Sequence, residues 1–166
     1  MKEKLQKYLA GEREGFSLVE LIIVIAIMAI LVGVVTLAVL PNIAKSRESK
    51  DISALDSVLS ATNNAIASAQ VSGNGSFDLP VDGTAPTAPS DTTAAKVQTD
   101  VMKLLGKTGI KLESSKASAS GNKISVTWTV TGGTIGITVK VVDSSSAQVA
   151  SEYNDNGSNY GFCVTN

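Results

Sequence analysis

A single carboxylate, Glu20, stands near the start of a long apolar stretch of this chain. From Leu18 to Leu40 every other side chain is Leu, Ile, Val, Ala, Met, Gly or one Thr. A charge at the middle of a bilayer costs roughly 2.5–3.5 kcal/mol on insertion scales, and less near the interface. An acid in this place is therefore a functional hypothesis that requires a partner. The alternative is a Glu that reaches the headgroups and has no further role.

A second group of candidate residues is an oxygen-rich cluster near the C-terminus. Carboxylate and amide oxygens bind calcium, but the spacing here is not that of an EF-hand. The run Asn-Asp-Asn-Gly is also ordinary turn chemistry, so we expect a turn, with a weak calcium site as the alternative. The cluster consists of Glu152, Asn154, Asp155, Asn156 and Asn159.

The remaining residues do not indicate catalysis or a cofactor. The chain has no histidine and one cysteine, which removes the usual general base and the cysteine-cluster zinc sites. Gly106-Lys107-Thr108 resembles the end of a phosphate-binding loop, but Val101 stands where that loop needs a glycine. We therefore expect Gly106 to end a helix, and we expect neither an enzyme nor a resident metal.

Nucleic acid is an unlikely partner by composition. The net charge is −1, and only 4% of the residues are aromatic. Lys103, Lys107 and Lys111 are spaced four apart, but no stacking aromatics are interleaved with them. We interpret them as a solvated stripe, with DNA or another anionic surface as the alternative. We expect the lone Cys163 to be buried and inert, with a disulfide between subunits as the alternative.

The apolar stretch must be positioned by a helix of its own. Its length of about 23 residues gives roughly 34 Å, enough to cross the hydrocarbon core. It is too long for the apolar part of a secretory signal. Lysines precede it and basic residues also follow it, so the charge bias only weakly places the N-terminus in the cytoplasm. Gly33 and Pro41 are the expected sites of a kink.

The rest of the chain predicts a small α+β head over residues 42–166. An amphipathic helix is expected over 42–72, with a solvated charged surface at 45–51. An irregular loop at 73–91, a short helix at 92–105 and an antiparallel sheet within 108–166 follow it. The apolar face of the short helix is Ala94, Val97, Val101, Leu104 and Leu105. The clearest hairpin joins Ile124–Val130 to Ile135–Val141 through Gly132-Gly133, with Gly136 expected close to Trp128.

The residues Gly15-Phe16-Ser17-Leu18-Val19-Glu20, followed at once by the apolar run, resemble the processing site of type IV prepilins. The resemblance covers roughly residues 11–45. It implies a leader of residues 1–15, a transmembrane and filament-core helix at 16–41, and the globular pilin head. The fold that the resemblance implies is a long N-terminal helix packed on an antiparallel sheet. Two departures are the longer leader and the missing cysteine pair.

The resemblance also implies a function and partners. A prepilin peptidase would cut between Gly15 and Phe16 and methylate the new amine of Phe16. Glu20 would then pair with the Phe16 amine of a neighbouring subunit as the helices leave the lipid. The expected product is a helical homo-oligomer on the cell surface, built by an inner-membrane platform and motor.

Three other interpretations remain open at this point. The first is a pseudopilin of a type II secretion or competence system. The second is a minor pilin that binds DNA or a surface. The third is a membrane-anchored protein that never assembles.

Overall fold

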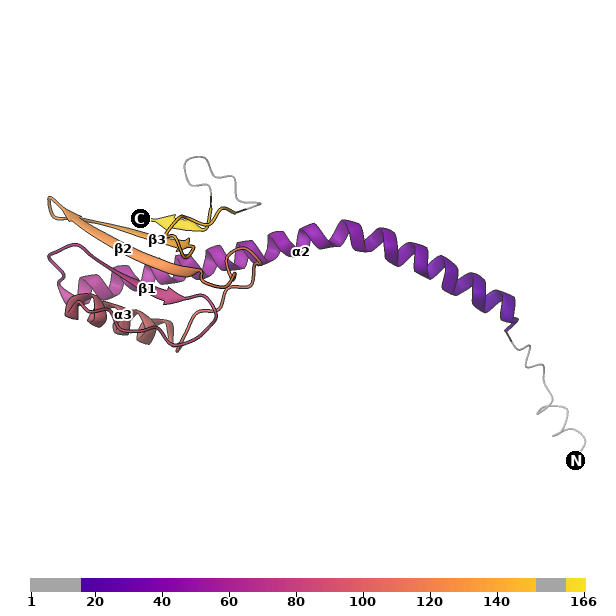
Figure 1. Ribbon diagram of the computed structural model, residues 1–166, viewed down its shortest axis with the longest axis horizontal. Helices are drawn as coiled ribbons and strands as arrows, with labels where there is room; N and C mark the ends of the chain where they lie inside the picture. The colour runs from indigo at the N-terminus through magenta and orange to yellow at the C-terminus, as the bar shows by residue number, and fades with distance from the viewer. Residues whose placement is uncertain (1–15, 152–160) are drawn as a thin grey trace, which may run out of the picture. The chain divides into compact units, whose positions relative to one another are not determined.

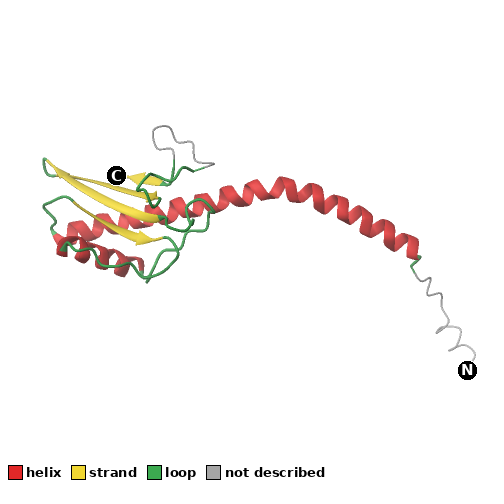
Figure 2. Cartoon of the chain, in the orientation of Figure 1, coloured by secondary structure: helices red, strands yellow, loops and turns green. Residues whose placement is uncertain are grey.

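The computed structural model describes residues 16–151 and 161–166 of the chain. It divides into two compact units, Met1–Pro41 and Asn42–Asn166. Helix α2 (Leu18–Ala69) belongs to both units, and every other described helix and strand belongs to the second (Figures 1 and 2).

Helix α2 remains helical through Gly33 and Pro41. Pro41 removes one intrahelical donor and crowds the preceding turn. The kinks expected at these two residues stay predictions.

The part of α2 in the second unit buries one face. Leu55, Val58, Thr62 and Ile66 are almost fully buried, and their three-to-four-residue spacing places them on one side of the helix. Ile52, Leu59 and Ala69 of the predicted amphipathic helix are partly buried against the same core.

Two charged residues of α2 contradict the expected solvated surface at 45–51. Glu48 is 4% exposed and Asp51 is 2% exposed. Both carboxylates accept hydrogen bonds from distant parts of the head, which sequence spacing does not reveal.

Helix α2 ends at Ala69, slightly before the predicted end at 72. Gln70 adopts a left-handed conformation, with φ 50°, and its N–H donates to the carbonyl of Ala67. The N–H of Val71 donates to the carbonyl of Ile66, which completes a Schellman ending without a glycine.

Strand β1 (Gly75–Pro80) lies inside the segment predicted as an irregular loop, so that prediction was wrong for these residues. Only Phe77 and Leu79 carry the apolar alternation, and Pro80 argued against a strand. A proline is tolerated here because β1 is at the edge of the sheet, where one side needs no ladder bonds.

The predicted hairpin is confirmed as β2 (Lys123–Thr131) and β3 (Thr134–Val142). Gly132 and Gly133 have φ 60° and 84°, the pair of positive values that a two-residue hairpin turn requires. The sheet is antiparallel in the order β1-β2-β3-β4, and β4 (Cys163–Thr165) is short. Asn166 after it bonds to both backbone groups of Ile137.

The close approach expected between Gly136 and Trp128 is instead made by Gly75. A Cβ at Gly75 would collide with the indole ring, whereas Gly136 is paired with Thr129. The indole N–H of Trp128 donates to the carbonyl of Gly73 at 2.9 Å. The ring therefore holds the chain where it enters β1.

Helix α3 (Thr92–Leu105) begins at Asp91, whose carboxylate accepts from the N–H groups of Thr93 and Ala94, and Gly106 ends it in the left-handed region. Leu104 is 56% exposed, contrary to its expected place on the apolar face. Gln98 is buried, and its amide donates to the carbonyls of Asp78 in β1 and Thr87 in the following loop.

One core joins these elements within the second unit. Side chains of α2, α3 and all four strands contribute to it or pack against it, with Trp128 and Phe162 the largest fully buried members. The predicted α+β class, a long helix with a small antiparallel sheet, is confirmed.

Candidate processing and assembly segment

The predicted cleavage site lies at the first described residue. Gly15 falls outside the described residues, and Phe16 directly after it is 91% exposed. Phe16 and Ser17 precede the first residue of α2, so the new N-terminus implied by the resemblance lies outside the helix.

Glu20 has a partner within its own chain. Its Oε2 accepts a hydrogen bond from the backbone N–H of Ser17 at 3.0 Å, and the Ser17 hydroxyl accepts one from the N–H of Val19 at 3.3 Å. These two bonds form a capping box at the start of α2.

The capping box changes the interpretation of Glu20. The carboxylate helps to start its own helix, and because the Ser17 N–H is a neutral donor, the negative charge of Glu20 remains. The negative charge at the first turn also interacts favourably with the helix dipole. The spacing Ser-x-x-Glu before an apolar run was the sequence signal for this arrangement.

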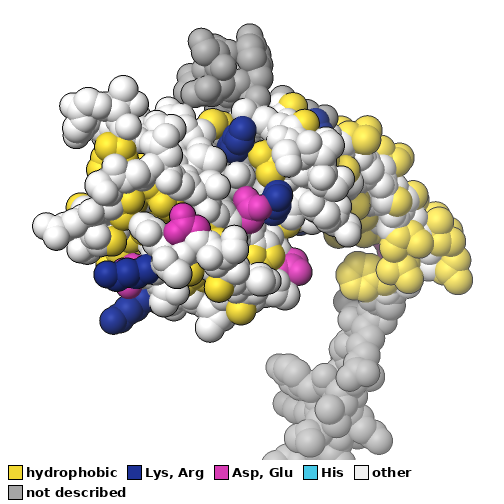
Figure 3. All heavy atoms as spheres, turned by 60° about the vertical axis from the view of Figure 1, so that its left-hand side comes forward, with side chains coloured by type: hydrophobic (Ala, Val, Ile, Leu, Met, Phe, Trp, Pro, Cys, Tyr) yellow, Lys and Arg dark blue, Asp and Glu magenta, His cyan; other side chains and the backbone are white. Residues whose placement is uncertain are grey.

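The apolar part of α2 has no protein around it in the described chain. Every residue from 16 to 43 is exposed, and one window of α2 reaches a mean hydropathy of 3.2 with none of it buried. Figure 3 shows hydrophobic side chains gathered on the visible face of this part of the helix. Because it is apolar all round, this surface requires lipid or other protein chains as its surroundings.

The second unit fixes its own part of α2 through polar contacts at 48–51. Asp51 accepts from the backbone N–H groups of Glu113 and Ser114 at 2.7 and 2.8 Å. Glu48 accepts from the Ser151 hydroxyl, and Lys50 lies 3.3 Å from the Glu113 carboxylate. The start of the head's helix is thereby tied to two loops that follow it much later in the sequence.

The other predicted sites are the calcium candidates near the C-terminus and the three lysines spaced four apart. The calcium candidates Glu152, Asn154, Asp155 and Asn156 lie outside the described residues, so a calcium site stays a prediction. Among residues 16–151 and 161–166, no three His, Cys, Asp or Glu side chains gather as a metal site would require. Lys103 lies in the last turn of α3, and Lys107 and Lys111 are exposed beyond it.

Cys163 is a free thiol in β4 and is only partly buried. Burial raises the pKa of this thiol, and the nearby Lys140 charge opposes that rise. The thiol is therefore less reactive than an ordinary cysteine at neutral pH.

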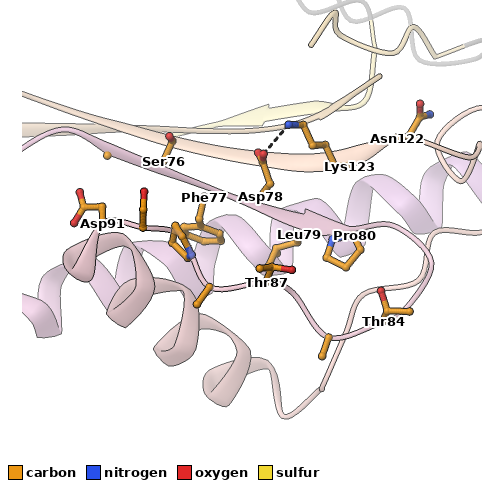
Figure 4. A pocket seen from close by; sticks show the side chains of 15 residues that line it. Ser76, Phe77, Asp78, Leu79, Pro80, Thr84, Thr87, Asp91, Asn122 and Lys123 are labelled. Atoms are coloured by element: carbon orange, nitrogen blue, oxygen red, sulfur yellow. Dashed lines mark hydrogen bonds and ion pairs between the residues drawn. The ribbon is translucent and has the colours of Figure 1, made fainter. Parts of the chain in front are cut away.

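A polar cavity of about 730 Å³ lies between β1 and the loop at 84–91. Figure 4 shows Asp78 and Lys123 facing one another beside it, and their ion pair measures 2.7 Å. The side chains of this pair are about half exposed. The amide of Gln98 links β1 to the loop, because it donates to the carbonyls of Asp78 and Thr87. Polar side chains line the cavity together with apolar ones, among them Phe77, Leu79 and Pro80.

The chain matches the prokaryotic N-terminal methylation motif over residues 12–36. The matched range contains Gly15, Phe16 and Glu20, and it supports a type IV pilin-like prepilin. A motif of this class implies processing by prepilin peptidase and points to a structural protein. Together with the exposed apolar helix, it fits a membrane-anchored precursor. No curated protein and no solved structure matches the chain.

Proposed function

We propose that this chain is the structural subunit of a type IV pilus, cleaved after Gly15 and assembled through α2 into a surface filament. One observation carries the proposal: a methylation motif leads directly into a helix whose residues 16–43 are all exposed. Removing so much apolar surface from water requires a bilayer first and neighbouring helices later.

In the filament, Glu20 would use its second oxygen. Oε2 is occupied by the N–H of Ser17, and the cleaved amine of Phe16 from a neighbouring subunit would pair with Oε1. A charge pair in a dry bundle offsets much of its own desolvation cost, so it gives register to the packing helices more than net stability. A platform and an energy-supplying motor in other chains would drive the assembly.

The first test concerns the cut. The full prepilin is expressed with and without a prepilin peptidase, and the mature N-terminus is sequenced. We expect N-methylated Phe16 only with the peptidase. Gly15→Leu should block the cut, because a bulky side chain beside the scissile bond prevents close approach. Gly11→Leu, a matched change in the leader, should not. A mature protein that still begins at Met1 would refute the proposal.

The second part of the test concerns the fibre. Electron microscopy of cells producing the chain should show surface filaments that bind antibodies against the head, and deletion of the chain should remove them. A correctly processed protein without long filaments would favour the pseudopilin interpretation instead.

A further inference from the structure

The charged residues that follow the apolar stretch are sorted by the fold. The sequence from 45 to 51 contains three basic and two acidic side chains, which is nearly balanced. Glu48 and Asp51 are buried and accept hydrogen bonds from the head, whereas Lys45, Arg47 and Lys50 are exposed. We call these three residues the basic collar.

The collar's positive charge is only partly neutralised by other side chains. Lys50 contacts Glu113 at 3.3 Å, but their side chains are 65% and 51% exposed, and such a pair is weak in water. Arg47 forms no ion pair in the described part of the chain.

Arg47 also lines a cavity of about 620 Å³ together with Lys111. The acids on its wall are Glu113 and Asp82, and Asp82 already accepts hydrogen bonds from the N–H and hydroxyl of Thr84. Those bonds lower the pKa of Asp82. Two cations and two carboxylates therefore line this hollow, which is large enough for a phosphate group, and the Glu113 carboxylate is already paired with Lys50.

The collar follows the apolar stretch closely on the same helix. Lys45 is five residues after Leu40, which is about one and a half helical turns. The polar layer of a bilayer begins where the hydrocarbon core ends, and long basic side chains extend along it.

We propose that the basic collar, together with Lys111, binds the phosphates of anionic phospholipids while the subunit resides in the membrane. The proposal rests on the membrane-resident stage of the proposed function. Juxtamembrane cations attract anionic lipid, and a guanidinium matches the two oxygens of a phosphate.

The test uses the full chain in nanodiscs with equal parts of phosphatidylcholine and phosphatidylglycerol. Lipids that stay bound after release into detergent are counted by native mass spectrometry. We expect enrichment of phosphatidylglycerol, falling roughly fivefold for each cation removed in Lys45→Gln/Arg47→Gln. The matched double variant Lys103→Gln/Lys107→Gln, in α3 and just after it, should keep the enrichment. High salt should abolish the difference, which a purely structural role would not predict.

Equal lipid retention by the wild type and the collar variant would overturn the proposal. Unchanged lipid retention with fewer fibres would also overturn it and would assign the collar to a neighbouring subunit's acids. A chain that does not enter the bilayer at all would refute the proposed function itself. An unchanged melting temperature of the collar variant would establish that folding does not cause the loss.

Discussion

Glu20 carries two separable contributions, because its carboxylate both caps α2 and supplies a charge. Its Oε2 accepts the Ser17 N–H, and an amide oxygen could accept the same bond. The two contributions can therefore be separated by one pair of substitutions.

We expect Glu20→Gln and Glu20→Ala to enter the membrane equally well and to lose filaments to a similar extent. The Gln variant keeps an acceptor for Ser17 and removes only the charge, whereas Ala also weakens the helix start by about 1 kcal/mol. Filaments are counted by electron microscopy, with cleavage checked by mass. Normal filaments in the Gln variant would contradict the proposed pairing with Phe16.

At this scale the sequence predicted local features better than distant contacts. Glu20 stands out because apolar residues surround it, whereas Phe16 was identified through the resemblance to the prepilin processing site. The Ser17 cap was not predicted, although its three-residue spacing from Glu20 was the signal for it. The burial of Asp51 and Glu48 was not readable. Their partners lie 62 to 103 residues away, and a charged run on a helix normally faces solvent.

At the scale of elements, Asp51 links α2 to the segment that begins at Glu113. Replacing it by Ala would leave two buried or partly buried backbone N–H groups without an acceptor. We expect Asp51→Ala to lower the free energy of unfolding by about 2–4 kcal/mol, and Asp51→Asn by about half as much. Urea unfolding followed by circular dichroism measures both.

The matched control for this prediction is Asp56→Ala, an exposed acid on the same helix. We expect its effect to stay within about 0.5 kcal/mol. Equal effects of the two alanine substitutions would show that Asp51 contributes charge rather than hydrogen bonds.

The elements that the sequence predicted were those with strong local patterns. The hairpin had sustained alternation and a Gly-Gly turn, and α3 had a cap at each end. Strand β1 had two alternating apolar residues and a proline, and its pairing with β2 supplies what its own sequence lacks. Ile110 and Leu112 also lie in the segment predicted as sheet and are buried, but only an isolated bridge between Asp82 and Lys111 forms there.

At the scale of the whole molecule, the two units contribute differently to stability. The hydrophobic core lies entirely within Asn42–Asn166, and the apolar window of α2 has no buried part. We therefore expect a chain truncated to residues 42–166 to be soluble and to unfold cooperatively. Its melting temperature, measured by calorimetry, should lie within a few degrees of the detergent-solubilised full chain.

A truncated chain that aggregates or melts without a cooperative transition would contradict this prediction. It would mean that the apolar helix stabilises the head in addition to serving as the membrane anchor. The division into anchor and head was predictable from hydropathy, and the α+β class from the apolar periodicities and the Gly-Gly turn. The sheet order and the tie between α2 and the late loops depend on pairings between distant segments, which a single sequence does not reveal.

The backbone contacts of Asn166 bear on where a label can be attached. Asn166 bonds to both backbone groups of Ile137, so a peptide tag fused after it would pull on an interior strand of the sheet. The Gly132-Gly133 turn has open space around it, but both glycines must be kept because each has a positive φ, so a label is inserted beside them and not in place of either. Fluorescent dyes or epitopes for imaging the proposed fibre in living cells therefore belong next to that turn.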